Sequence, residues 1–227
     1  MRAVLCLFAG LVLSVPVWAL GLADLSNQDT VSGLKAALTQ SSAMAVSKLG
    51  IPGGFLGNPR VRIPLPGSLN KAAGLMRSLG MGKYVDELET TMNRAAEAAV
   101  PEGKAVLTDA VKKMTVQDAK TILTGGNDSA TQYFKSNTSA ALTAKFLPIV
   151  KNATSKVGLA QQYNTFAEQG AKLHLLNDKQ ASLEGYVTQK TLDGLFLMMA
   201  EEEKAICQNP LGQTSKLVKK VFGAIGK

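Results

Sequence analysis

Apolar residues recur every three or four positions along most of this chain, which is the period of an α-helix with one buried face. In the last long segment, about residues 184–208, the spacing is carried by Leu192, Leu195, Phe196, Met199 and Ile206. Alternating runs of β-branched residues, which would indicate strands, are almost absent. The pattern therefore predicts an all-α protein, folded as a compact multi-helix bundle.

Capping and breaking residues predict where the helices begin and end. We expect helices over about residues 29–50, 68–79, 84–99, 102–114, 116–124, 129–146, 149–157, 159–172 and 184–208, and a short one after Pro210. Thr115 and Asp118 have the spacing of a capping box, and so have Ser129 and Gln132. Pro148 is expected to kink or divide the helical region around it.

One long segment rich in proline and glycine, about residues 50–67, interrupts the helical pattern. The four prolines and four glycines of residues 50–66 keep it from being helical. Apolar residues alternate there with Arg60, Arg62 and prolines. Two interpretations remain open. The favoured one is a structural strap along the bundle, and the other is a binding loop that offers two guanidinium groups to a ligand or partner.

The first 19 residues have the pattern of a secretory signal peptide. A short basic start, Met1-Arg2, precedes the apolar run 3–15, and small residues at positions 17 and 19 follow Pro16. The run is too short to span a bilayer, so cleavage after Ala19 is favoured over an uncleaved anchor. The sequence therefore predicts a single exported helical domain, residues 20–227, with no transmembrane span.

The charge balance bears on the partners of such an exported chain. The sequence has 25 Lys and Arg against 17 Asp and Glu, and cleavage after Ala19 leaves 24 against 17, a net charge of +7. Near the C-terminus, Lys216, Lys219 and Lys220 lie opposite an apolar stripe, which suits an anionic membrane surface or, as favoured, a helix docked on the bundle. Nucleic acid is not expected as a partner, because export removes the protein from it.

Few residues in the chain suit metal or catalytic chemistry. Cleavage leaves one cysteine, Cys207, and one histidine, His174, so no disulfide, metal site or cofactor is expected. Glu201, Glu202 and Glu203 could supply metal ligands or an acid/base pair, but consecutive helical residues fan over about 200°. A solvated helix face is the favoured interpretation of these glutamates, and catalytic residues stay unknown.

Several strings in the sequence resemble those of one family. They are Gly57-Asn58-Pro59 running into Ile63-Pro64-Leu65-Pro66, Met92-Asn93-Arg94-Ala95-Ala96-Glu97, Thr124-Gly125-Gly126 with Ala130-Thr131-Gln132-Tyr133-Phe134, and Leu192-Asp193-Gly194-Leu195-Phe196 with Glu201-Glu202-Glu203-Lys204. The chain resembles the bacterial domain of unknown function 4197 family from about Leu34 to Phe222. The resemblance implies an exported, mainly helical protein of Gram-negative bacteria. It implies no activity, cofactor or catalytic residue.

We therefore expect a non-enzymatic periplasmic protein that binds an anionic or amphiphilic envelope component or an envelope protein. Anionic lipid, lipopolysaccharide and cell-wall glycan are the candidate ligands. The alternatives are a carboxylate-based or metal-assisted hydrolase or transferase, using Glu97, Asp193 and Glu201 to Glu203, and a structural or assembly protein. The candidate ligand-binding residues are Asn58, Arg60, Arg62, Asn93, Arg94, Glu97, Gln132, Tyr133, Asp193 and Glu202. If the polar residues of these family motifs are buried together, they would instead form a structural hydrogen-bond network.

Overall fold

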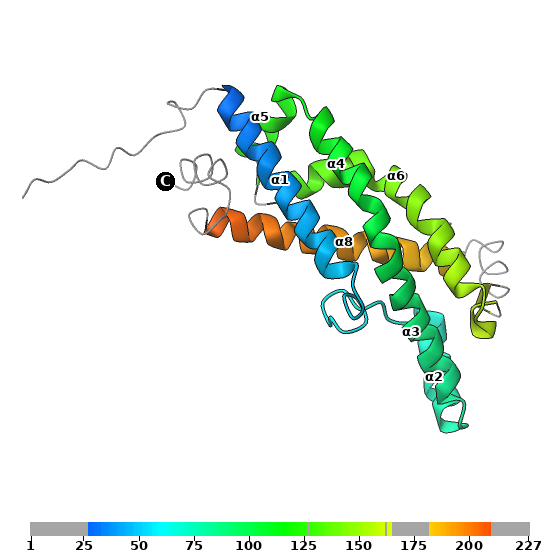
Figure 1. The fold of residues 1–227 in the computed structure, drawn as a ribbon. Coiled ribbons are helices and arrows are strands. Elements are labelled where there is room, and N and C mark those ends of the chain that lie inside the picture. The colour runs from blue at the N-terminus through cyan, green and yellow to red at the C-terminus, as the bar shows by residue number, and fades with distance from the viewer. Residues whose placement is uncertain (1–26, 127, 162, 165–181, 210–227) are drawn as a thin grey trace, which may run out of the picture.

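The computed structural model describes residues 27–126, 128–161, 163–164 and 182–209. Within this part of the chain the regular elements are helices and no strand occurs, which confirms the all-α prediction (Figure 1). The predicted signal peptide, His174 and the C-terminal lysines lie outside the described residues. The elements are α1 (Asn27–Leu49), α2 (Gly67–Ser78), α3 (Gly82–Ala99), the 3₁₀-helix η2 (Val100–Gly103), α4 (Lys104–Lys113), α5 (Val116–Thr124), α6 (Ser129–Thr154) and α8 (Leu183–Gln208).

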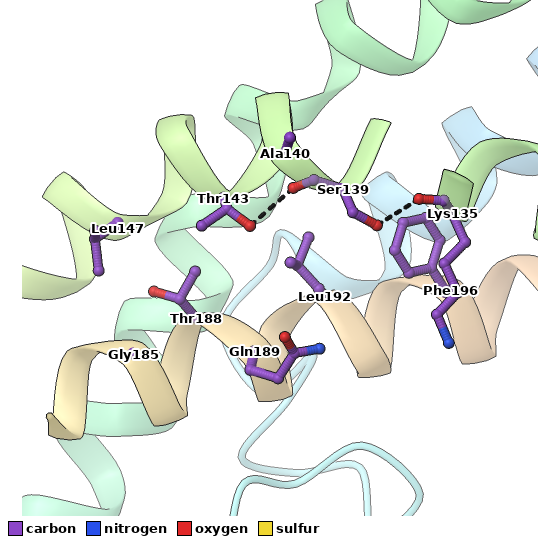
Figure 2. Close-up of a pocket in the computed structure, with 10 residues that line it drawn as sticks. All are labelled: Lys135, Ser139, Ala140, Thr143, Leu147, Gly185, Thr188, Gln189, Leu192 and Phe196. Atoms are coloured by element: carbon purple, nitrogen blue, oxygen red, sulfur yellow. Dashed lines mark hydrogen bonds between the residues drawn. The ribbon is translucent and has the colours of Figure 1, made fainter. Parts of the chain in front are cut away.

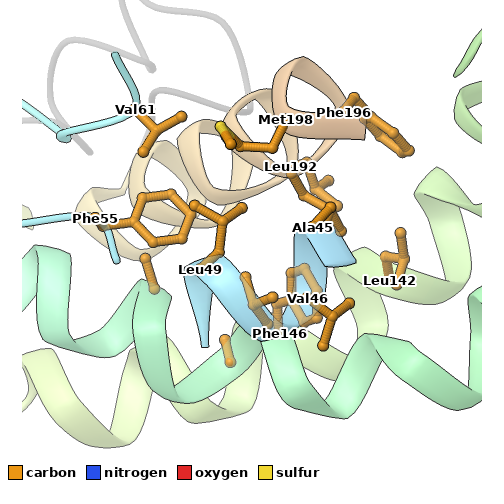
Figure 3. Packing of buried hydrophobic residues seen from close by; sticks show 14 of the residues in the cluster. Ala45, Val46, Leu49, Phe55, Val61, Leu142, Phe146, Leu192, Phe196 and Met198 are labelled. Carbon is orange, nitrogen blue, oxygen red and sulfur yellow. The ribbon is translucent and has the colours of Figure 1, made fainter. Parts of the chain in front are cut away.

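Helix α8 runs across the bundle and packs against α1, α3 and α6 (Figure 1). One apolar cluster takes buried side chains from all of these helices and from the loop after α1. Figure 3 shows Phe55 and Val61 of that loop meeting Leu49 of α1 and Met198 of α8. The loop therefore closes one side of the core, which confirms that it packs along the bundle as a strap.

Helix α6 buries every fourth residue along its length, and these residues are Ala130, Phe134, Thr138, Leu142, Phe146, Val150 and Thr154. Four residues turn an α-helix by about 400°, so the buried stripe advances by about 40° at each step. The stripe thus winds around α6, which lets the helix contact α5 and α4 as well as α3 and α8.

The prediction that Pro148 could divide this region is wrong, because α6 continues through it to Thr154. Pro148 lies on the exposed side of the helix. Its ring removes the hydrogen bond to the carbonyl of Ala144, and water can solvate that carbonyl on an exposed side.

Of the helix starts whose N-caps are described, those of α5 and α8 have a side-chain cap hydrogen bond. Thr115 and Asp118 form the predicted capping box at the start of α5. The second predicted box is wrong: Asp128 is the N-cap of α6, and the Ser129 hydroxyl donates to the carbonyl of Gly126 instead. Gln132 Nε2 donates to Asp128 Oδ2 at 3.0 Å. The chain therefore turns into α6 one residue earlier than the Ser129 spacing indicated.

Helix α2 and the start of α3 form an arm that extends beyond the other helices (Figure 1). The turn between them passes through Gly80, whose φ of +82° is a conformation that favours glycine. None of the described helices is long and apolar enough to cross a membrane.

Candidate functional site

The strap, residues 50–66, is held on α3 by the carboxylate of Glu97. Glu97 Oε1 accepts hydrogen bonds from the backbone N–H groups of Gly53, Phe55 and Leu56, each at 3.0 Å. Arg94 donates to Glu97 Oε2 at 2.6 Å. Burial alone would raise the pKa of Glu97, but the hydrogen bonds from Leu56, Arg94, Phe55 and Gly53 hold that pKa below its ordinary value. Glu97 therefore stays ionised as the anchor of the first half of the strap.

Asn93, one turn earlier on α3, anchors the second half. Its Oδ1 accepts from the N–H of Ile63 at 2.8 Å and its Nδ2 donates to the carbonyl of Ile63 at 2.9 Å. The side-chain amide therefore pairs with both backbone groups of Ile63, as a neighbouring β-strand would. The strap is also bound by Arg62 Nε, which lies 3.1 Å from Glu89 Oε1, and by the Tyr186 hydroxyl, which donates to the carbonyl of Pro64. These contacts form the structural hydrogen-bond network that the sequence left as an alternative.

The three glutamates near the end of α8 bind three different elements. Glu201 pairs with Arg60 of the strap, and Glu202 pairs with Lys48 of α1. Glu203 accepts from the backbone N–H groups of Ala130 and Thr131, both at 3.0 Å, and from the Thr131 hydroxyl at 2.8 Å. The interpretation of these residues as a solvated face is therefore wrong, because all three are at least partly buried and occupied.

This arrangement also separates the carboxylates that a hydrolase would need to bring together. Glu97 lies under the strap, and Asp193 lies exposed beside Gln189, which donates to it at 2.9 Å. Among the described residues no group of three or more metal-ligating side chains is assembled.

Burial raises the pKa of Glu203 above its ordinary value, although the hydrogen bonds from Thr131 and Ala130 oppose this, so Glu203 titrates at higher pH than Glu97.

The other candidate residues lie apart from one another. Asn58 Oδ1 accepts a hydrogen bond from the N–H of Arg60 at 3.1 Å, and this bond shapes the turn of the strap at these residues. The Tyr133 hydroxyl donates to the carbonyl of Ala110 at 3.0 Å. Burial, and secondly the charge of Asp118, raise the pKa of Tyr133. In this structure the side chains of Asn58 and Tyr133 form hydrogen bonds with backbone groups of the same chain. A ligand-binding role for these residues stays a prediction.

A groove of about 620 Å³ lies instead between α6 and α8 (Figure 2). Its lining combines apolar side chains, three hydroxyls, one amide and one lysine: Lys135, Ser139, Ala140, Thr143, Leu147, Gly185, Thr188, Gln189, Leu192 and Phe196. Figure 2 shows Ser139 and Thr143 on the α6 wall, Thr188 and Gln189 on the α8 wall, and Lys135 near Phe196 at one end. The groove therefore has an apolar floor with polar groups on both walls.

Thr188 is the unusual member of this lining. It is only 2% exposed, and its hydroxyl has no hydrogen-bond partner among the described residues. Three other buried threonines donate to the carbonyl four residues earlier in their own helix: Thr138 at 2.6 Å, Thr154 at 3.0 Å and Thr191 at 2.8 Å. An unsatisfied buried hydroxyl costs about 1–3 kcal/mol. A ligand group that forms a hydrogen bond with the Thr188 hydroxyl would therefore gain more binding free energy than the same hydrogen bond would give at a solvated position.

One cation, Lys135, lies on the α6 wall of the groove. Helix α6 contains Lys135, Lys145 and Lys151 and no acidic residue. All three lysines are exposed, and none forms an ion pair within the part of the chain that the structure describes. Arg60 and Arg62, by contrast, are paired with glutamates. An unpaired cation, Lys135, therefore lines the groove, whereas the two arginines of the strap are paired.

Sequence reasoning did not find this groove. Its residues are ordinary threonines, alanines and leucines, spaced like any helix face, and no motif marks them. The absence of acidic residues from 129–154 was a signal in the sequence, and it could have indicated the positive charge of α6.

The described part of the chain thus defines an all-α bundle with a pinned strap and an open groove. Residues 24–223 match the model of a family described as a protein of unknown function, DUF4197, and the chain belongs to this family. The resemblance seen in the sequence motifs is confirmed. Comparison with curated proteins finds no match, and comparison with solved structures finds none either.

Proposed function

We propose that this protein is an exported, periplasmic binding protein that holds an anionic amphiphile in the groove between α6 and α8. The observation that carries the proposal is the groove itself, with its apolar floor and the unpartnered Thr188 hydroxyl. Its volume of about 620 Å³ lies within the range of about 300–1,000 Å³ that small-molecule sites occupy. The predicted signal peptide supports the location.

The chemistry of the lining favours an amphiphile over a purely polar ligand. Leu147, Leu192, Phe196 and Ala140 offer apolar contact along the groove. Ser139 and Thr143 are donors committed to the helix backbone, so they present mainly acceptor lone pairs, whereas the Thr188 hydroxyl has its proton free. A chain with a carbonyl or ester oxygen near Thr188 would satisfy that hydroxyl.

The charge of α6 favours an anionic headgroup. Lys135 lies at one end of the groove, and Lys145 and Lys151 continue the positive charge of the helix. A ligand whose apolar chain occupies the groove would place its headgroup at an end of the groove, where it meets water. We therefore assign the headgroup to the Lys135 end.

The strap is not the binding surface in this proposal. Its two arginines are paired, and Glu97 and Asn93 hold its backbone. A ligand that bound there would have to break these contacts, and each buried group left unpaired would cost about 1–3 kcal/mol.

The test is a titration of the purified exported chain with a fluorescent fatty acid and with a lysophospholipid that carries an anionic headgroup. Ala140→Trp places a large ring in the groove, and we expect it to reduce affinity at least tenfold. The matched control is Ala141→Trp, because Ala141 is the next residue of α6, is exposed and does not line the groove. Equal affinity in the two variants, or no binding by the unmodified chain, would contradict the proposal.

The headgroup assignment has its own test. Lys135→Glu should weaken binding of the anionic lysophospholipid about fivefold, which corresponds to about 1 kcal/mol, and should leave a zwitterionic analogue unaffected. Lys145→Glu makes the same change of charge on α6 outside the groove lining. If Lys145→Glu weakens binding as much as Lys135→Glu, only the general charge matters and the assignment to the Lys135 end is wrong.

A further inference from the structure

Beyond each end of the groove between α6 and α8, a glutamate of α8 is bonded to a threonine of α6. On one side the Thr131 hydroxyl donates to Glu203 Oε2 at 2.8 Å. On the other side the Thr154 hydroxyl, whose proton is shared with the carbonyl of Val150, lies 3.2 Å from Glu184 Oε1. Side-chain bridges between the two helices therefore bound the groove at both ends.

These bridges lie on the line of the groove. Thr131 is four residues before Lys135, and Thr154 is seven residues after Leu147. Spacings of four and seven residues keep a side chain on the same face of an α-helix. Glu203 is likewise seven residues after the last lining residue of α8. The faces that line the groove are thus the faces that carry the bridges.

The space between the helices is filled between Leu147 and the Glu184 bridge. Val150 and Leu183 are fully buried there. Asn164 reinforces the bridge, because its Nδ2 donates to both carboxylate oxygens of Glu184 at 3.0 Å and its Oδ1 accepts from the N–H of Leu183 at 2.8 Å. The groove is therefore closed beyond Leu147.

The two walls give nearly the same length for the groove. Figure 2 shows Leu147 and Gly185 at one end of the lining, and Lys135 and Phe196 at the other. At about 1.5 Å per residue, the α6 wall is about 18 Å long and the α8 wall about 17 Å. An extended alkyl chain advances by about 1.25 Å per carbon, so walls of this length match a chain of about 14 carbons.

We propose that the ligand of this groove carries an unbranched acyl chain of about 12–14 carbons, whose terminal methyl group lies against Leu147. The headgroup lies at the Lys135 end, where the lysine is exposed. This inference rests on the proposed function, and it adds the length of the chain and the residue that sets this length. A longer chain gains no further affinity, because its extra carbons stay in water.

The experiment is displacement of a fluorescent fatty acid from the purified exported chain by saturated fatty acids below their micelle concentrations. Each methylene group that enters the groove leaves water, so we expect affinity to rise at least about threefold for every two carbons, from about 8 to about 14 carbons. From about 14 to about 20 carbons we expect no further rise, because the groove is already filled.

A variant at the closed end tests the role of Leu147. Leu147→Trp shortens the groove, and we expect the preferred chain length to fall by about two carbons or more. The matched control is Ala144→Trp, because Ala144 is exposed on the same helix and does not line the groove. We expect the control to keep the preferred length of the unmodified chain. If Leu147→Trp folds poorly, the fatty acid series on the unmodified chain still tests the length.

Two results would overturn the inference alone. Affinity that keeps rising up to the longest acids would show that the groove sets no length. A preferred length that is the same in Leu147→Trp and Ala144→Trp would show that Leu147 does not set it. Failure of the proposed function looks different, because then no fatty acid of any length would bind, or Ala140→Trp would bind as tightly as Ala141→Trp, and this inference would fall with it.

Discussion

The strap and the α6–α8 groove differ in how their polar groups are used. On the strap, Glu97 alone accepts three backbone hydrogen bonds and one from Arg94, and Asn93 pairs with both polar groups of Ile63. In the groove, the Thr188 hydroxyl is without a partner among the described residues, and so is the charge of Lys135. The residues that stand out in the sequence thus hold the chain together, whereas the residues free to meet a ligand look ordinary.

The largest expected effect is on the strap. Glu97→Ala leaves the N–H groups of Gly53, Phe55 and Leu56 without their acceptor, and we expect it to lower the free energy of unfolding by about 3–5 kcal/mol. Urea unfolding followed by circular dichroism measures this. Glu87→Ala, an exposed change on the same helix, should alter stability by less than about 0.5 kcal/mol. A small loss for Glu97→Ala would mean that the strap is not pinned by this carboxylate.

A methyl group tests how tightly the strap packs on α8. A Cβ at position 194 would lie 2.8 Å from Phe55 Cε1 and 3.3 Å from Val61 Cβ, so Gly194→Ala should cost about 1–3 kcal/mol. Gly74→Ala is the matched control on α2, where a Cβ would meet no described atom within 4 Å. It should stabilise the helix by up to about 1 kcal/mol. If the melting temperatures of both variants move in the same direction, the strap does not approach α8 this closely.

The hydroxyl in the groove should behave in the opposite way to the strap residues. Thr188→Val removes an unpartnered group, so we expect stability to be unchanged or raised by up to about 1 kcal/mol. Thr191→Val removes a hydrogen bond to the carbonyl of Val187 and should lower stability by about 1 kcal/mol. Amphiphile affinity should fall for Thr188→Val only. A destabilising Thr188→Val would show that this hydroxyl already has a structural partner.

The smallest effect is a pH dependence of opposite sign at two carboxylates. Hydrogen bonds lower the pKa of Glu97, so its stabilisation is present at neutral pH and is lost as the pH falls through that lowered pKa. Burial raises the pKa of Glu203, so its contribution is largest at low pH and declines as the pH rises through the raised pKa. Glu97→Gln should therefore destabilise more at pH 7 than at pH 3, and Glu203→Gln more at pH 3. The same trend in both variants would contradict these assignments.

Part of this structure could be predicted from the sequence. Helical periodicity predicted the fold class, the four prolines predicted the non-helical strap, and the Thr115–Asp118 spacing predicted the start of α5. These features could be predicted because each depends on residues that are close in the sequence. The predicted Ser129 cap was wrong because Asp128 competes with Ser129 for the N-cap position. The predicted division at Pro148 was wrong because Pro148 is exposed, so water can solvate the carbonyl that its ring leaves unpaired. The partners of Glu201, Glu202 and Glu203 and the groove could not be predicted, since they depend on how α8 packs against distant elements.

Hydrogen exchange with and without the anionic lysophospholipid tests the central claim most directly, because it reports on the strap and the groove in one sample. We predict that the lipid slows exchange in peptides covering residues 135–147 and 185–196, which line the groove. Peptides covering residues 53–65 should already exchange slowly and should not change. Slower exchange confined to the strap would contradict the account.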